Sequence, residues 1–219
     1  MNRLFDWLRA WDDLVFPPKP LCPFCAREGC LDLGCCRVCL DSLAVKWEAV
    51  KMHGYSCYSL LPYQGFAREL IHKMKYQNGR EIAAAFGILL SRALQEEPSL
   101  ASVNYLVPVP LHPSRLARRG FNQAALLADN ISRGWRRPVF KGVVRAKKTG
   151  PQSNLGYNER NFNLRGAFQV LPGFNLRGKR CLIVDDVITS GFTFRALAQV
   201  IESYGGKPRG VFLARTEIL

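Results

Sequence analysis

The sequence predicts an α/β fold, in which helices flank a mostly parallel sheet, with a small cysteine-rich module at the N-terminal end. Short apolar runs at residues 105–111 and 181–184 are each followed by an amphipathic helical pattern. Parallel strands covered on both faces need such continuous apolar runs. In addition, six of the eight cysteines fall between residues 22 and 39. A chain of 219 residues can bury one good core beside a small module.

The N-terminal end is expected to form a domain of its own over residues 1–45, with residues 46–219 as the second domain. Residues 1–11 have the pattern of a short helix, and prolines at positions 17, 18 and 20 make a stiff joint after it. No apolar core of a secretory signal is visible in the first ten residues. The longest apolar stretch, residues 82–90, is too short to span a bilayer, so a cytoplasmic location is expected.

The cysteines of the module have the spacing of metal ligands. Cys22 and Cys25 form one CxxC pair, Cys36 and Cys39 form another, and ten residues separate the pairs. Two such turns can present four thiolates in a tetrahedral site suited to structural zinc. Cys35 is an alternative to Cys36, but only Cys36 completes a CxxC pair with Cys39. A disulfide cluster conflicts with the cytoplasm, and a redox CxxC lacks the expected thioredoxin-like context.

Two helices are expected in the middle of the chain, at residues 66–74 and 81–95. The polar face of the first carries Arg68, Lys73 and Lys75. The strand at residues 105–111 runs out into a loop, and the next helix shows on one face Phe121, Ala124, Ala125, Ala128 and Ile131.

Basic residues gather around this helix. Arg115, Arg118 and Arg119 precede it and can make forked contacts with phosphate oxygens, although a solvated basic helix face is the alternative for each. The segment at residues 145–165 is basic, polar and poor in apolar residues, which predicts a loop between strands. Long loops of this kind can close over a charged ligand.

The segment at residues 181–204 is the most informative part of the chain. An apolar strand leads to Asp185 and Asp186, expected where the strand ends, and a helix then runs to Gly205 and Gly206. The turn between them holds Thr189, Ser190, Gly191 and Thr193. Backbone N–H groups at a helix start attract anions, and carboxylates accept hydrogen bonds from hydroxyls or help to hold a divalent cation. Together they suit a ribose 5-phosphate, although acidic and hydroxyl residues also serve as ordinary helix caps.

This stretch resembles the phosphoribosyl diphosphate (PRPP) motif of type I phosphoribosyltransferases. The resemblance implies that Asp185 and Asp186 contact the ribose hydroxyls and that residues 189–193 hold the 5′-phosphate, with Mg²⁺ accompanying PRPP. The candidates for contacts with the diphosphate are Arg115, Arg119, Lys147, Lys148 and Gln152.

Five blocks together resemble the ComF/GntX family of competence-associated proteins. They are the paired CxxC module, FARELIHKMKY, VPVPLHPSRLARRGFNQ, KKTGPQSNLGYNERNFNLRGAF and IVDDVITSG, and they occur in this order. The family implies a zinc finger joined to a type I phosphoribosyltransferase fold, and a role in DNA uptake or DNA use. Departures from its pattern are Ser190, where threonine is usual, and the additional Cys30 and Cys35.

Two functions remain open from the sequence. A net charge of +14 favours phosphate-rich partners, but it does not choose between a phosphorylated ligand and nucleic acid. One hypothesis is an active phosphoribosyltransferase that transfers the phosphoribosyl group of PRPP to a base or amine. The other is a competence protein that binds PRPP and handles single-stranded DNA, alone or with other uptake proteins. Aromatic side chains near basic residues are candidates for base stacking, namely Phe121, Trp135, Phe140, Tyr157, Phe162 and Phe168. Aromatic residues are more often part of the core, however, and we expect this of Phe121 and Phe168.

Overall fold

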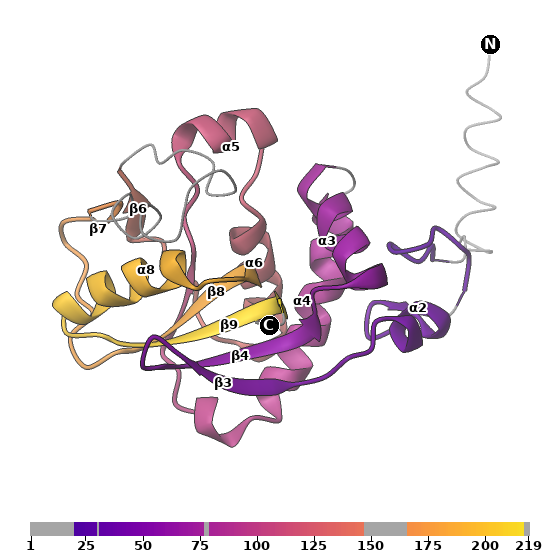
Figure 1. Cartoon of the computed structure of the whole chain (residues 1–219), viewed down its shortest axis with the longest axis horizontal. Coiled ribbons are helices and arrows are strands. Elements are labelled where there is room, and N and C mark those ends of the chain that lie inside the picture. The colour runs from indigo at the N-terminus through magenta and orange to yellow at the C-terminus, as the bar shows by residue number, and fades with distance from the viewer. Residues whose placement is uncertain (1–19, 30, 77–78, 147–165, 217–219) are drawn as a thin grey trace, which may run out of the picture.

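A five-stranded sheet forms the centre of the protein in the computed structural model, which describes residues 20–29, 31–76, 79–146 and 166–216 (Figure 1). The strands lie in the order β3-β4-β9-β8-β5. The edge strand β3 pairs antiparallel with β4, and the other three pairings are parallel. The strand bounds are β3 (Glu48–Met52), β4 (Tyr55–Pro62), β9 (Lys207–Arg215), β8 (Arg180–Ile188) and β5 (Tyr105–Pro108).

Helices cover both faces of this sheet. One face carries α3 (Gly65–Tyr76), α4 (Gly79–Gln95) and α6 (Gln123–Trp135), and the opposite face carries α8 (Phe192–Ser203) (Figure 1). Strand β8 shows the division clearly, because Leu182 and Val184 join the core under α3, α4 and α6. Their neighbours Cys181 and Ile183 join the core under α8. The alternation follows from the two-residue repeat of a strand.

The cysteine module packs on the first of these cores. Its elements are β1 (Leu31–Asp32), β2 (Cys35–Cys36) and α2 (Arg37–Ser42). Phe24 of the module lies against Phe86 of α4, with 4.8 Å between ring centroids, and both side chains are buried. The division of the chain at residue 45 stays a prediction.

The remaining elements are short. They are η1 (Pro98–Leu100), α5 (Pro113–Arg119), β6 (Val143–Arg145) and β7 (Phe168–Val170). Strands β6 and β7 pair with each other, so the basic segment at residues 145–165 does connect two strands. The interior of that segment and the expected helix at residues 1–11 lie outside the described residues.

One expectation about strand ends was wrong. Asp185 and Asp186 lie inside β8, which continues to Ile188. The backbone keeps pairing with β9 as far as Ile188 and Arg215, although the apolar run ends at Val184. On the other side, β5 pairs with β8 only as far as Val184. The two acids therefore stand where β8 has lost one neighbouring strand, and a cavity opens there.

Candidate functional site

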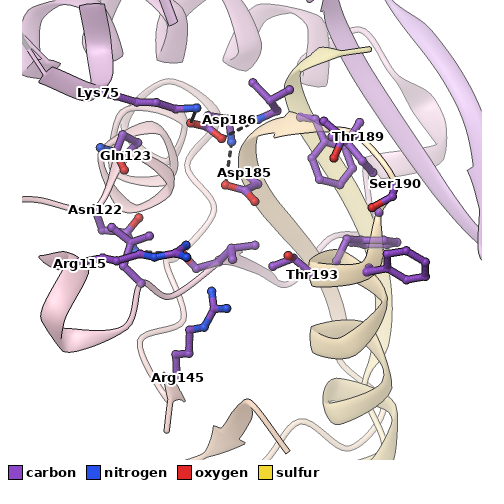
Figure 2. Close-up of a pocket in the computed structure, with 18 of the residues that line it drawn as sticks. Lys75, Arg115, Asn122, Gln123, Arg145, Asp185, Asp186, Thr189, Ser190 and Thr193 are labelled. Carbon is purple, nitrogen blue, oxygen red and sulfur yellow. Dashed lines mark hydrogen bonds and ion pairs between the residues drawn. The ribbon is translucent and has the colours of Figure 1, made fainter. Parts of the chain in front are cut away.

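The cavity at this end of β8 has a volume of about 250 Å³ and is lined mainly by polar side chains (Figure 2). Its polar side chains come mainly from α3, the α5–α6 region, β6, the end of β8 and the turn that leads into α8. Figure 2 shows side chains from these parts pointing toward the same space. The polar residues lining it are Lys75, Arg115, Arg119, Asn122, Gln123, Arg145, Asp185, Asp186, Thr189, Ser190 and Thr193.

One wall is the turn at residues 189–193, which we call the phosphate loop. All five of its residues line the cavity, and its last two begin α8, a helix of 12 residues. The first N–H groups of a helix have no partner within the helix and carry a partial positive charge, so they attract anions. Gly191 precedes the helix with a φ of 72°, a left-handed conformation that favours glycine.

The two carboxylates differ in their surroundings. Asp186 forms an ion pair with Lys75, with 2.9 Å between Oδ2 and Nζ, and both side chains are largely shielded from water. Burial alone would lower the pKa of Lys75, but the charge of Asp186 outweighs it and raises that pKa. Asp185 has no comparable ion pair among the described residues. Burial, and then the charge of Asp186, raise its pKa to about 8.

Arginines supply positive charge to the opposite wall. Arg145 is only 7% exposed, and burial together with the charge of Arg115 lowers its pKa. Burial and then the charges of Arg119 and Arg118 lower the pKa of Arg115 as well. Guanidinium groups stay charged at these shifts. Crowded cations of this kind favour an anion in the cavity, since it would offset their mutual repulsion.

The amide side chains beside the arginines complete the wall. The Asn122 carboxamide caps α6, since its oxygen accepts from the backbone N–H of Ala124 and its nitrogen donates to the carbonyl of Val109. Gln123 is 3% exposed and accepts from Arg119 through Oε1 at 3.2 Å. Its Nε2 donates to nothing in the described part of the chain. A buried donor in this state suits a ligand oxygen.

Most residues predicted from the sequence line this cavity. They include both acids, the phosphate loop, Arg115 and Arg119, whereas Arg118 is not among the lining residues. Lys147, Lys148 and Gln152 lie outside the described residues.

The sequence interpretation did not assign four of the polar lining residues to the site: Lys75, Asn122, Gln123 and Arg145. Lys75 was assigned to a polar helix face, yet its side chain is only 21% exposed. The neighbouring Asn122 and Gln123 stand at the end of the arginine-rich motif, which was the available signal for them.

The four predicted zinc ligands come together in the module. The Sγ atoms of Cys22, Cys25, Cys36 and Cys39 all lie within 4.8 Å of one another. Those of Cys25 and Cys36 are 3.8 Å apart, close to the separation of about 3.8 Å that a tetrahedral site with Zn–S bonds of about 2.3 Å requires. The structure thus places Cys36 in the cluster, as the spacing favoured. Cys30 lies outside the described residues.

The electrostatics of the cluster fit a bound cation. Burial alone would raise the pKa of Cys22, but N–H groups of Cys36, Phe24 and Cys25 donate to its sulfur and lower the pKa to about 7. Burial and neighbouring sulfurs raise the pKa of Cys39, so a full set of four thiolates needs a compensating positive charge. Burial and nearby thiolates raise the pKa of Cys35 to about 12, which keeps it a neutral thiol.

Comparisons with known proteins identify the type of domain. The model of the phosphoribosyl transferase domain matches residues 116–214, which contain both acids and the phosphate loop. This match and the mostly parallel sheet confirm the predicted phosphoribosyltransferase-type α/β fold. Among solved structures, adenine phosphoribosyltransferase from Leishmania donovani is 10% identical with a TM-score of 0.46, covering 78% of this chain and 86% of that one.

Two curated relatives extend the similarity beyond that domain. DNA utilization protein YhgH of Escherichia coli K12 is 32% identical over 189 residues, covering 84% of this chain and 78% of that protein. Competence protein F of Haemophilus influenzae is 34% identical over 141 residues, covering 62% of each chain. In the part of the chain that the structure describes, no helix has the length and apolar character needed to cross a membrane.

Proposed function

Because this chain belongs to the family of competence protein F and DNA utilization protein YhgH, we propose that its cavity binds PRPP and that it acts in natural competence. Its work would be the uptake and handling of single-stranded transforming DNA in the cytoplasm. The observation that carries the ligand is one cavity lined by a helix-start loop, two adjacent carboxylates and three arginines. Each of these suits a different part of PRPP.

In this proposal the 5′-phosphate occupies the phosphate loop, where the N–H groups and hydroxyls of residues 189–193 donate to its oxygens. The ribose hydroxyls donate to Asp185 and Asp186. Arg115, Arg119 and Arg145 neutralise the diphosphate through charge-assisted hydrogen bonds. The donor set also fits Mg²⁺, which proteins bind through one or two carboxylates together with substrate phosphates. Bound there, Mg²⁺ would offset diphosphate charge beside Asp185.

Calorimetry with PRPP and Mg²⁺ tests the ligand. The unaltered protein is expected to bind PRPP, and the double variant Asp185→Ala/Asp186→Ala is expected to lose binding. Glu69→Ala is the matched control, because it removes a carboxylate from the exposed side of α3 and should leave the affinity unchanged. Absence of binding by the unaltered protein would refute the assignment of the cavity.

An active phosphoribosyltransferase is the alternative function, and the same cavity favours it. Transfer passes through an oxocarbenium-like sugar, and cationic side chains stabilise the departing diphosphate. Arg115 and Arg145 supply such charge at the wall of the cavity, and both side chains are at least partly buried. Diphosphate release in the presence of PRPP and a panel of bases and amines tests this function. Release above the rate without acceptor would establish transfer, and no release with any acceptor would leave a binding role.

Direct contact with single-stranded DNA is supported by an exposed aromatic side chain beside Arg119, one of the residues that line the cavity. Tyr76 ends α3 with 58% of its surface exposed. The Arg119 guanidinium lies 5.7 Å from its ring centroid, and the His72 ring lies 4.9 Å from it. An exposed ring beside an arginine suits base stacking next to a phosphate. Phe140 and Phe168, named from the sequence, are buried and do not offer such a face.

Titration of single-stranded DNA at two salt concentrations tests this contact. The expected result is binding that weakens steeply with salt, and that Tyr76→Ala weakens further at low salt, by roughly five- to 100-fold for one stacked base. Tyr204→Ala is a matched control, because Tyr204 is also exposed but lies at the C-terminal end of α8, away from the phosphate loop. Undetectable affinity at low salt would exclude direct DNA handling.

For the cysteine cluster we propose one structural Zn²⁺ held by Cys22, Cys25, Cys36 and Cys39. Four protein ligands close the coordination sphere, so the ion would stabilise the module and leave catalysis to the cavity. Metal analysis of reduced protein is expected to give about one zinc per chain. A clearly lower content would count against the site.

A further inference from the structure

The β3–β4 hairpin contacts the phosphate loop from outside the cavity. Its turn, His53 and Gly54, lies between the paired residues Met52 and Tyr55. His53 Nε2 is 2.8 Å from the carbonyl oxygen of Ser190, a residue 137 positions away in the chain. A carbonyl oxygen only accepts hydrogen bonds, so Nε2 carries the proton and donates it. The hairpin is thus tied to the loop by a hydrogen bond.

Two further contacts come from the same turn. The His53 ring stacks on Phe192, with 5.4 Å between centroids and 29° between planes. Met52 fills the space beside Gly191, since a Cβ built there would lie 2.2 Å from its Sδ. The hairpin therefore contacts three successive residues of the phosphate loop.

The geometry of the turn does not favour histidine. His53 and Gly54 have φ angles of 51° and 88°, the left-handed pair of a two-residue hairpin turn. Asparagine, aspartate or glycine is favoured at the first of these positions. His53 is exposed, so burial of its ring does not explain its presence. Its contacts with Ser190 and Phe192 do.

The hydrogen bond has a direct consequence for the ligand. In a trans peptide unit the C=O and the N–H point in opposite directions, and the described chain contains no cis peptide bond. Holding the Ser190 carbonyl toward His53 directs the Gly191 N–H to the other side. Ser190 and Gly191 both line the cavity, so that side is where a phosphate would lie.

We propose that His53 is a positioning residue that holds the phosphate loop in its anion-binding conformation before a ligand arrives. The proposal rests on the proposed function, because it assumes that the loop receives the 5′-phosphate of a phosphorylated ribose. His53 itself touches no ligand. It acts through Ser190 and Phe192, and it should affect the sugar-phosphate end of the site and not the diphosphate end.

Two substitutions at His53, tested with one ligand for each end of the site, distinguish an effect on the sugar-phosphate end from one on the diphosphate end. His53→Phe keeps an aromatic ring over Phe192 but removes the donor to Ser190, and His53→Gln keeps an N–H donor. Each protein is titrated by calorimetry with ribose 5-phosphate and, separately, with inorganic diphosphate and Mg²⁺. His53→Phe is expected to weaken ribose 5-phosphate binding roughly three- to tenfold, the value of one hydrogen bond. Diphosphate binding should stay unchanged, and His53→Gln should recover most of the lost affinity.

The other outcomes are also decisive. If the unaltered protein binds both ligands and His53→Phe binds ribose 5-phosphate equally well, His53 has no positioning role although the proposed function stands. An equal loss for both ligands would indicate general damage to the fold and would overturn the proposal. If the unaltered protein binds neither ligand, the proposed function fails, and the role of His53 fails with it.

Discussion

Replacing Asp185 by asparagine should stabilise the ligand-free protein while impairing the site. Burial, and then the charge of Asp186, raise the pKa of Asp185 from 3.8 to about 8. The folded state therefore holds a proton that the unfolded chain releases between about pH 4 and pH 8. Stability supplied by this group is present at low pH and is lost as the pH rises through that window. Above pH 8 the folded protein carries a partly buried negative charge beside that of Asp186, which Lys75 and Arg145 offset only in part.

The size of this effect follows from the shift. A change of about 4 pKa units corresponds to about 6 kcal/mol in full, at 1.36 kcal/mol per unit. Asp185 is only partly buried in an open cavity, so water and nearby cations reduce the cost, and we expect about 2–3 kcal/mol above pH 8. Asparagine keeps the shape of the side chain and removes the charge. The gain in the free energy of unfolding from Asp185→Asn should therefore vanish near pH 4, where Asp185 of the folded protein is protonated and uncharged.

Urea unfolding at pH 5 and pH 8.5 measures this difference, with the unfolding midpoint compared at unchanged m value. Asp186→Asn is the matched control, because it removes the neighbouring carboxylate but leaves Lys75 without its ion pair. It should destabilise the protein by about 1–3 kcal/mol. Equal effects of the two substitutions, or a gain from Asp185→Asn that does not change with pH, would refute the charge assignment.

Three other predictions concern the loop, the cavity and the module. Gly191→Ala should lower the free energy of unfolding by about 2–4 kcal/mol and weaken PRPP binding, because the new Cβ would collide with Met52. Gly178→Ala is the control, since Gly178 has nearly the same φ, 73°, but open space where the Cβ would lie. A similar loss of stability in both variants would disprove the role of the Met52 contact. Binding of PRPP and Mg²⁺ should tighten as the pH rises from 7 to 8.5, because Asp185, whose pKa is raised to about 8, must lose its proton on binding. Calorimetry in two buffers at pH 7 should detect the release of about one proton, and an affinity that does not change with pH would contradict this. Cys36→Ser should lose zinc and Cys35→Ser should keep it, and metal analysis showing the reverse would exchange their roles.

The sequence predicted the parts of the site that are contiguous in the chain. Asp185, Asp186 and the phosphate loop follow one another, and their residue types suffice to suggest a sugar phosphate. Local patterns also gave α3, α4 and α8 to within a few residues at each end. Such features depend on hydrophobic spacing and on the chemistry of a turn, which a single segment contains.

Contacts between distant segments could not be predicted in this way. The helical spacing of Lys75 predicts a position on the exposed polar face of α3, and only the tertiary structure brings it to Asp186 of β8. Likewise, no sequence pattern around His53 predicts its hydrogen bond to Ser190, 137 residues away. The end of β8 was misplaced for the same reason, because its length is set by pairing with β9 and not by its own side chains.

The unequal surroundings of the two acids suggest how they divide their work. Lys75 already neutralises Asp186, so that carboxylate is held in place and gains little from a further cation. Asp185 gains more, because a cation or a set of donating hydroxyls would offset the burial and repulsion that raise its pKa. We therefore expect Asp185 to be the acid whose ionisation is coupled to ligand binding. The stability that Asp185 costs the empty protein would then be recovered when the ligand binds, as is common at functional sites.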